Sequence, residues 1–331
     1  MFKKLLKILA VGAIFVVILA MPFGDGIKAS ADGVAEIAME LESGKILYCR
    51  NADVRLPMAS TTKIMTALII AEDCDLSEVI TVPDAAVNVE GSSIYLKRDE
   101  TISIKDLLYG LMLRSGNDAA TALAIHHSGT VEKFVDKMNE RAEELGATDT
   151  RFANPSGLPS DNHYTTAKDL CNVARAAMSN QIVKEIVSTK NYSGDFRCFT
   201  NKNKLLSSFE GANGVKTGYT KAAGRCLVSS AVRDNMDVVC VVLNCYDMYE
   251  RSAEIIDDCF EKYCVETIGA DRVFDFKGRL CRLKDDCKVL VEKDKPIEML
   301  VKDSDDGKAY AKLEIYCENN LIFGRNLYTI N

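Results

Sequence analysis

Histidine is scarce in this chain of 331 residues, and tryptophan is absent. Two of the three histidines, His126 and His127, are adjacent, so we expect no histidine-based metal site. No Cys-x-x-Cys pair occurs, which argues against a zinc ribbon and a thioredoxin-type redox site. The sequence therefore predicts chemistry that uses neither a metal ion nor a cofactor.

Runs rich in lysine and arginine are also missing. The first 31 residues contain four lysines and one aspartate, so the remaining 300 carry a net charge of −10, against −7 for the whole chain. Binding to nucleic acid depends on neutralising phosphate charge. We therefore expect a protein this acidic not to bind nucleic acid.

The N-terminus has the features of an export signal. Three lysines near the start precede an uncharged stretch over residues 8–21, and Ala29-Ser30-Ala31 is a small-x-small cleavage site. The uncharged stretch has 14 residues, whereas a helix needs roughly 20 to span a bilayer. We predict a signal peptide over residues 1–31, and the alternative is an uncleaved anchor. Either way the protein is expected outside the cytoplasm, tethered to the membrane only if the leader is uncleaved.

The twelve cysteines have no regular spacing, and 300 residues supply a sufficient core without disulfide bonds. Cys226 and Cys240 lie in apolar runs, where a free thiol behaves as a small hydrophobic group. Cys281 and Cys287 could meet across a hairpin, and the sequence leaves their pairing open.

The character of the chain changes near residue 270. Before this point, strand-like and amphipathic helical patterns are mixed, and after it short β-like runs alternate with Lys/Asp/Gly turns. We therefore predict two domains, a large α/β one over residues 32–270 and a small β-rich one over residues 271–331. The elements predicted in the first are a hairpin over 34–50, helices over 130–146 and 170–178, and strands over 226–232 and 238–243.

Lys63 is the only charged residue between Pro57 and Ala71, in a run apolar enough to be a buried helix. A buried ammonium is costly unless it is paired or loses its proton. Ser60, three residues earlier, falls on the same helix face. A serine attacks a carbonyl only if a base takes its proton, and a lysine with a lowered pKa can act as that base. The pair is thus a candidate nucleophile and base, and the alternative is a chance surface pair.

Two further polar triplets each occur once, Ser115-Gly116-Asn117 and Lys216-Thr217-Gly218. Alone, the first is compatible with a turn or helix cap, and the second with the end of an exposed strand. Together with Ser60-x-x-Lys63, and in this order, they resemble the three active-site motifs of penicillin-binding serine D,D-peptidases and serine β-lactamases. The central glycine of the second triplet and the run Asn154-Pro-Ser-Gly-Leu158 are similar to the low-molecular-weight penicillin-binding proteins, the serine-type D-Ala-D-Ala carboxypeptidases.

The resemblance implies a fold and an activity. The fold is a β-lactamase/transpeptidase-like α/β/α catalytic domain whose antiparallel sheet combines the N-terminal hairpin with the later strands. A helical region inserted between them carries Ser115, and a small β-rich domain follows. The activity is removal of the terminal D-alanine from peptidoglycan stem peptides, with inhibition by β-lactams.

The resemblance also implies roles for four catalytic residues. Ser60 becomes an acyl-enzyme, and Lys63 is the base for that step. Ser115 relays a proton to the departing D-alanine. Asn117 hydrogen-bonds both the substrate amide and Lys63.

Substrate binding is assigned to the third motif and its neighbours. By resemblance, Lys216 keeps a positive charge near Lys63, and Thr217 binds the terminal carboxylate together with a basic group. Gly218 is a further substrate-binding residue. The backbone N–H groups of Ser60 and Tyr219 form the oxyanion hole. A basic residue must bind the terminal carboxylate, and the candidates by position are Arg251 and Lys202. His163 is expected to be structural.

Two other functions remain as alternatives. A serine β-lactamase needs a water-activating carboxylate, and the Glu-x-x-Leu-Asn pattern that supplies it in class A enzymes is absent. A non-catalytic wall-binding or β-lactam-sensing protein on the same fold needs neither a nucleophile nor a base, yet both are present.

Overall fold

The computed structural model describes residues 33–304 and 309–330 of the chain. The predicted signal peptide over residues 1–31 lies outside the described residues. No helix in the described part is both long enough and apolar enough to cross a bilayer.

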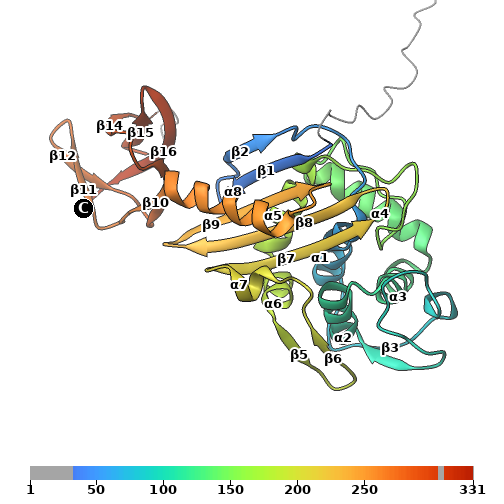
Figure 1. Cartoon of the computed structure of the whole chain (residues 1–331). Coiled ribbons are helices and arrows are strands. Elements are labelled where there is room, and N and C mark those ends of the chain that lie inside the picture. The colour runs from blue at the N-terminus through green and yellow to red at the C-terminus, as the bar shows by residue number, and fades with distance from the viewer. Residues whose placement is uncertain (1–32, 305–308, 331) are drawn as a thin grey trace, which may run out of the picture.

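The centre of the larger part is a five-stranded antiparallel sheet (Figure 1). Its strands are β1 (Ala35–Glu40), β2 (Ile46–Arg50), β7 (Ala212–Thr220), β8 (Gly224–Arg233) and β9 (Met236–Leu243). They lie in the order β2-β1-β9-β8-β7, so β1 pairs with both β2 and β9. The prediction that the N-terminal hairpin and the later strands share one sheet is confirmed.

Helices cover both faces of this sheet. They are α8 (Met248–Lys262) on one face, and α1 (Lys63–Asp73) and α5 (Ala167–Ser179) on the other (Figure 1). Successive side chains of strand β9 point to opposite faces of the sheet, as in any β-strand. Val239 and Val241 pack in the core that contains α1 and α5, whereas Val238 and Cys240 pack in the core that contains α8. The predicted α/β/α architecture is confirmed.

A helical region lies between β2 and β7 in the sequence. Thr130 caps one of its helices by accepting a hydrogen bond from Lys133 N, as its cap-type sequence predicted. Its helical elements are η1 (Ala59–Thr62, 3₁₀), η2 (Asp84–Ala86, 3₁₀), α2 (Ile104–Tyr109), η3 (Gly110–Arg114, π), α3 (Asn117–Ser128), α4 (Val131–Glu144), α6 (Gln181–Ser188) and α7 (Leu205–Ser208). Two short hairpins complete it, β3 (Val79–Thr81) with β4 (Thr101–Ser103) and β5 (Asn191–Ser193) with β6 (Cys198–Thr200).

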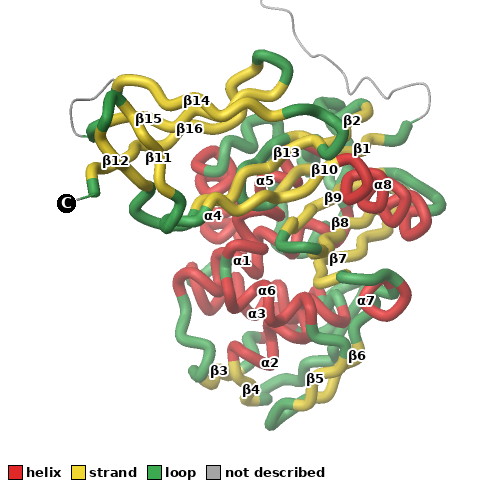
Figure 2. The backbone as a smooth tube through the Cα atoms, turned by 90° about the vertical axis from the view of Figure 1, so that its left-hand side faces the viewer, coloured by secondary structure: helices red, strands yellow, loops and turns green. Residues whose placement is uncertain are grey.

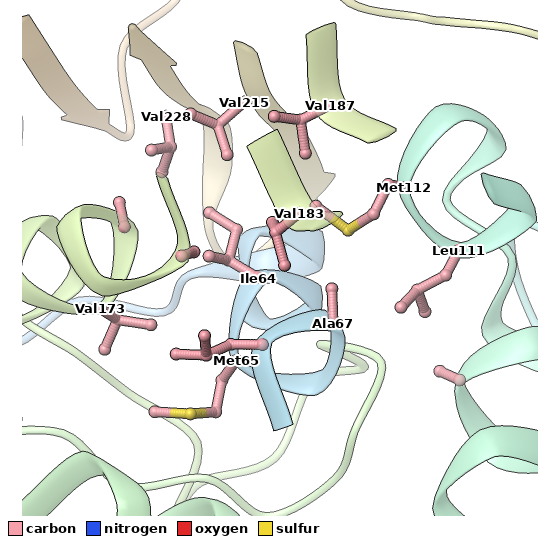
Figure 3. Packing of buried hydrophobic residues seen from close by; sticks show 14 of the residues in the cluster. Ile64, Met65, Ala67, Leu111, Met112, Val173, Val183, Val187, Val215 and Val228 are labelled. Carbon is pink, nitrogen blue, oxygen red and sulfur yellow. The ribbon is translucent and has the colours of Figure 1, made fainter. Parts of the chain in front are cut away.

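Helix α1 occupies the middle of the core. Figure 3 shows Ile64 and Ala67 of α1 among side chains of the sheet, of α6 and of the segment that precedes Ser115. Every residue from Lys63 to Ala71 is buried. This burial on all sides explains why the run around Lys63 contains no other charge.

The C-terminal part is built from strands. Strand β10 (Tyr263–Ile268) pairs with β13 (Cys287–Glu292), and a second five-stranded sheet has the order β11-β12-β16-β15-β14 (Figure 2). The strands of this sheet are β11 (Val273–Phe276), β12 (Arg279–Arg282), β14 (Ile297–Asp303), β15 (Ala311–Cys317) and β16 (Asn320–Thr329). Its apolar residues form a core of their own around Leu313 and Ile315. The predicted β-rich C-terminal domain is confirmed as part of the fold.

All twelve cysteines lie in the described part of the chain, and all are free thiols. Cys281 and Cys287 do not form the disulfide that the sequence left open. Burial raises the pKa of the Cys226 thiol to about 12. It therefore packs as a small apolar group, as its sequence context predicted.

Candidate active site

Ser60 lies in the tight turn η1 that leads into α1. The sequence predicted an ordinary helix here, but the first turn is 3₁₀ and Ala59 has a left-handed φ of 49°. The hydroxyls of Thr61 and Thr62 donate to the carbonyls of Met58 (2.6 Å) and Ala59 (2.8 Å) and thereby hold the turn. The serine is thus presented on a rigid, strained element, as nucleophiles often are.

Lys63 is fully buried, and its Nζ contacts three oxygen atoms. They are Ser60 Oγ at 3.2 Å, Asn117 Oδ1 at 2.7 Å and the backbone carbonyl oxygen of Ser156. An uncharged amine has two N–H donors and one lone pair. If the donors go to Asn117 and Ser156, the lone pair remains for the Ser60 hydroxyl. This geometry lets Lys63 accept the Ser60 proton.

The electrostatic surroundings favour the uncharged amine. Burial, followed by the charges of Lys216 and Lys202, lowers the pKa of Lys63 well below 10.5. Burial and the charge of Lys202 lower the pKa of Lys216 to about 7. The opposing charge that acts on Lys63 is that of Asp118. Its carboxylate accepts hydrogen bonds from Ser93 Oγ and from the backbone N–H groups of Ile94 and Leu96.

Ser115 lies at an irregular junction between η3 and α3. It has a left-handed φ of 66° and is buried, and Gly116 rather than Ser115 is the residue that precedes α3. Ser115 is therefore the C-cap of η3 and not the N-cap of α3 that its sequence alone would allow. Asn117 starts α3, and its Nδ2 donates to the Glu90 carbonyl at 2.6 Å, which turns its Oδ1 toward Lys63.

Strand β7, at the edge of the sheet, forms one side of the site. A Cβ atom on Gly218 would lie 3.1 Å from Ser60 N, so a glycine lets the strand run close to the nucleophile. Lys216 on the same strand is buried and donates to the Thr217 carbonyl at 2.9 Å. Three segments far apart in the sequence therefore meet around Ser60.

The structure separates the two basic candidates for the carboxylate. The Lys202 charge acts on both Lys63 and Lys216, and Asn203 anchors its segment to β7 by donating to the Gly214 carbonyl at 3.0 Å. Lys202 therefore lies beside the site.

Arg251 is not brought to this site, which corrects the prediction made from its position in the sequence. Its guanidinium is held by both carboxylate oxygens of the buried Glu36, at 2.7 and 3.1 Å. It also donates to Tyr48 Oη at 2.7 Å. Arg251 belongs to α8, which covers the sheet face opposite α1, so a count of residues along the chain placed it wrongly.

The sequence pointed to the loop around Ser156 only through its resemblance to the low-molecular-weight penicillin-binding proteins. Asn154 Oδ1 accepts hydrogen bonds from the backbone N–H groups of Ser156 (3.2 Å), Gly157 (2.7 Å) and Leu158 (3.1 Å). A cluster of Asn, Pro, Ser and Gly signals such a turn. The contact with Lys63 is made by the backbone carbonyl oxygen of Ser156, and a motif of side chains cannot predict a backbone contact.

His163 joins this loop to the nucleophile turn. Its Nδ1 accepts from Ala153 N at 2.9 Å, so its Nε2 carries the proton and donates to Thr62 Oγ1 at 2.7 Å. Burial is the main cause that lowers the pKa of His163 to about 4. This imidazole is neutral and structural, as the sequence predicted, although its link to Thr62 was not foreseen.

The chain resembles known proteins in sequence and in structure. A family model described as D-alanyl-D-alanine carboxypeptidase matches residues 26–247. The D-alanyl-D-alanine carboxypeptidase DacF of Bacillus subtilis is 35% identical over 281 residues, which cover 79% of this chain and 72% of DacF. DacB2 of Mycobacterium tuberculosis, with the same description, is 36% identical over 221 residues, 64% of this chain and 75% of DacB2.

The solved structure of penicillin binding protein 5 from Haemophilus influenzae superposes with a TM-score of 0.75 at 26% identity. The match covers 90% of this chain and 96% of that one, so it includes both the α/β part and the C-terminal strands. Sequence, fold and site geometry agree, and the chain belongs to the D-alanyl-D-alanine carboxypeptidase family.

Proposed function

We propose that this protein removes the terminal D-alanine from peptidoglycan stem peptides through an acyl-enzyme on Ser60, and that β-lactams inhibit it by acylating the same serine. The observation that carries the proposal is the position of Lys63 Nζ, 3.2 Å from Ser60 Oγ in a buried, cationic environment. That position gives the serine a base close enough to take its proton.

The reaction proceeds through an acyl-enzyme intermediate. Lys63 takes the proton of Ser60 as Oγ bonds to the carbonyl carbon of the penultimate D-alanine. The N–H groups of Ser60 and Tyr219 stabilise the oxyanion, each typically worth about 3 kcal/mol. The C–N bond then breaks, the proton passes from Lys63 through Ser115 to the departing amine, and D-alanine leaves. Water hydrolyses the ester, which regenerates Ser60.

The remaining site residues hold the substrate in this proposal. Lys202 and Thr217 bind the terminal carboxylate, and Lys216 keeps a positive charge beside Lys63. A lysine binds a carboxylate as a point charge without the bidentate fork of an arginine. Asn117 orients both Lys63 and the substrate amide.

The other parts of the chain complete the proposal. Family members act on peptidoglycan, so the protein works outside the cytoplasm. Residues 1–31 direct export, residues 32–270 carry the chemistry, and residues 271–331 form a separate β-rich domain. A membrane tether exists only if the leader is uncleaved, and no nucleic acid is a partner.

One assay tests the activity and its alternatives together. The purified protein is incubated with a D-Ala-D-Ala peptide and, separately, with a fluorescent penicillin. We expect D-alanine release and a long-lived penicillin adduct. Ser60→Ala should lose both. Ser43→Ala, which changes an exposed serine of the β1–β2 turn, is the control and should keep both. A short-lived adduct without D-alanine release would indicate a β-lactamase, and a long-lived adduct without release would indicate a sensor.

A further inference from the structure

A second pocket lies next to the active-site strand, beyond Tyr219. It has a volume of about 570 Å³ and is lined by Tyr219, Gly224, Arg225, Asn244 and Tyr246. Its rings are unusually exposed, at 65% for Tyr219 and 76% for Tyr246. Exposed aromatic side chains around a hollow are typical of binding surfaces.

Strand pairing ties this pocket to the reaction centre. Tyr219 directly follows Gly218, whose backbone passes close to Ser60 N, and it pairs across the ladder with Arg225. Opposed residues of an antiparallel pair project from the same face of the sheet. The two side chains therefore stand together, one residue beyond the proposed oxyanion hole.

Arg225 is held in place but not neutralised. Its guanidinium stacks 4.7 Å above the Tyr246 ring, and its Nη1 donates to the Tyr246 carbonyl at 3.4 Å. Within residues 33–304 and 309–330, no carboxylate forms an ion pair with Arg225, and no acidic residue lines the pocket. Most of its five donors remain for a ligand, and the planar fork suits a carboxylate.

The proposed function places this pocket at the upstream end of a bound stem peptide. Lys202 is anchored at the start of β7 through the contact between Asn203 and Gly214. For a stem peptide extended along β7, the proposed reaction puts the scissile carbonyl at Tyr219 N and the terminal carboxylate toward Thr217 and the side chain of Lys202. The preceding residues of the peptide then lie at Tyr219 and beyond.

We propose that Arg225, Tyr219 and Tyr246 form a second substrate subsite, which binds a carboxylate carried by the stem peptide upstream of D-Ala-D-Ala. The inference rests on the proposed function, because it assumes that a stem peptide lies along β7. The guanidinium pairs with the carboxylate, and the two rings cover the apolar atoms beside it.

The test uses two synthetic peptides that end in D-Ala-D-Ala and differ only in an upstream side chain, a free carboxylate in one and its carboxamide in the other. For the wild-type protein we expect kcat/KM to be on the order of tenfold higher for the acid, mainly through KM. In Arg225→Gln the ratio falls to about one, and in Arg225→Lys it is intermediate. Melting temperatures establish that each variant is folded.

Arg279→Gln is the matched control, because Arg279 also stacks on a tyrosine, Tyr310 at 5.6 Å, but in the C-terminal part. It should keep the wild-type ratio. Equal kcat/KM values for the two peptides in the wild type would overturn the subsite. An equal loss of kcat/KM for both peptides in Arg225→Gln would also overturn it, because the arginine would then act on the D-Ala-D-Ala end that both peptides share. Absence of D-alanine release from both peptides in the wild type would instead overturn the proposed function, and the subsite with it.

Discussion

At the scale of single residues, Lys63 and Lys216 divide two tasks between two buried amines. In the proposed mechanism, Lys63 is uncharged so that it can accept a proton from Ser60, and Lys216 is charged so that it holds the pKa of Lys63 down and attracts an anionic substrate. Burial lowers the pKa of both, and their mutual repulsion favours having only one of them protonated. The pair titrates as a unit, so the pH profile reports on both.

The charge on Lys216 predicts a loss of activity at alkaline pH. Since its pKa is about 7 in the free protein, its proton is lost as the pH rises through that value. We expect kcat/KM for a D-Ala-D-Ala peptide to fall on this alkaline side. Lys216→Arg should move the falling limb to higher pH, because a guanidinium stays protonated. An alkaline limb that does not move would show that another group controls it.

His163 predicts a loss of stability in acid. Its pKa is lowered from 6.5 to about 4 in the folded protein, so between these values the unfolded chain binds more protons than the folded one. The free energy of unfolding should therefore decrease as the pH falls through this window, by about 3 kcal/mol in total. His163→Gln should flatten this decrease in denaturant titrations at pH 4 to 7. The same slope in variant and wild type would mean that other groups cause the effect.

At the scale of elements, the loop over residues 154–158 and the turn η1 act as one unit. Gly157 has a φ of 87°, and a Cβ atom placed on it would lie 1.9 Å from the Ala59 carbonyl oxygen. No larger residue fits there unless the turn that carries Ser60 moves. Displacement of reacting groups by about an ångström can cost a hundredfold in rate.

Gly157→Ala should therefore slow acylation by penicillin on the order of a hundredfold. Gly278→Ala is the control, because Gly278 also has a positive φ, of 77°, but no atom lies within 4 Å of its Cβ position. It should cost about 1 kcal/mol of stability through backbone strain and leave the acylation rate unchanged. The measurement is the rate of labelling by a fluorescent penicillin, and similar rates in the two variants would contradict the steric coupling of loop and turn.

The sequence predicted elements better than it predicted the contacts between them. The turn signal of the hairpin, the cap and glycine stop of α4 and the hydrophobic stripe of α5 predicted these elements, and the structure has them. The 3₁₀ start of α1 and the left-handed Ser115 depend on tertiary contacts, which override local preference. The sequence could not predict that the Ser156 carbonyl contacts Lys63, because every residue has a backbone carbonyl and only the fold determines which one reaches the lysine.

At the scale of the whole molecule, one hydrophobic cluster belongs to the α/β part and another to the C-terminal strands, and a third around α8 also includes Leu290 of β13. Leu68 of α1 packs in the core of the α/β part, and Leu313 of β15 in that of the C-terminal strands. The change in sequence character near residue 270 is the basis for the predicted boundary between the two parts. Arg251 was misplaced because distance along the chain does not tell on which face of a sheet a later helix packs.

Because the C-terminal strands have a hydrophobic cluster of their own, we expect a substitution there to destabilise that part without affecting the active site. Leu313 is fully buried, so Leu313→Ala should lower the stability of the C-terminal part by about 2–5 kcal/mol. The rate of acylation by penicillin should stay at the wild-type value, because no residue of that core lies at the site. Leu68→Ala, at a similarly buried position on the helix that follows the Ser60 turn, should reduce both. Hydrogen exchange measured together with penicillin labelling separates the two effects, and a loss of labelling in Leu313→Ala would contradict the independence of the cores.

The protonation state of Lys63 can be measured directly by NMR on protein carrying ¹³C at the lysine ε-carbons. The resonance is assigned by its disappearance in Lys63→Arg, and its chemical shift is followed with pH. We expect an uncharged amine at pH 7, since burial and two neighbouring cations oppose the ammonium. A Lys63 that remains an ammonium at pH 7 and titrates near 10.5, like an exposed lysine, would contradict its role as the base for Ser60.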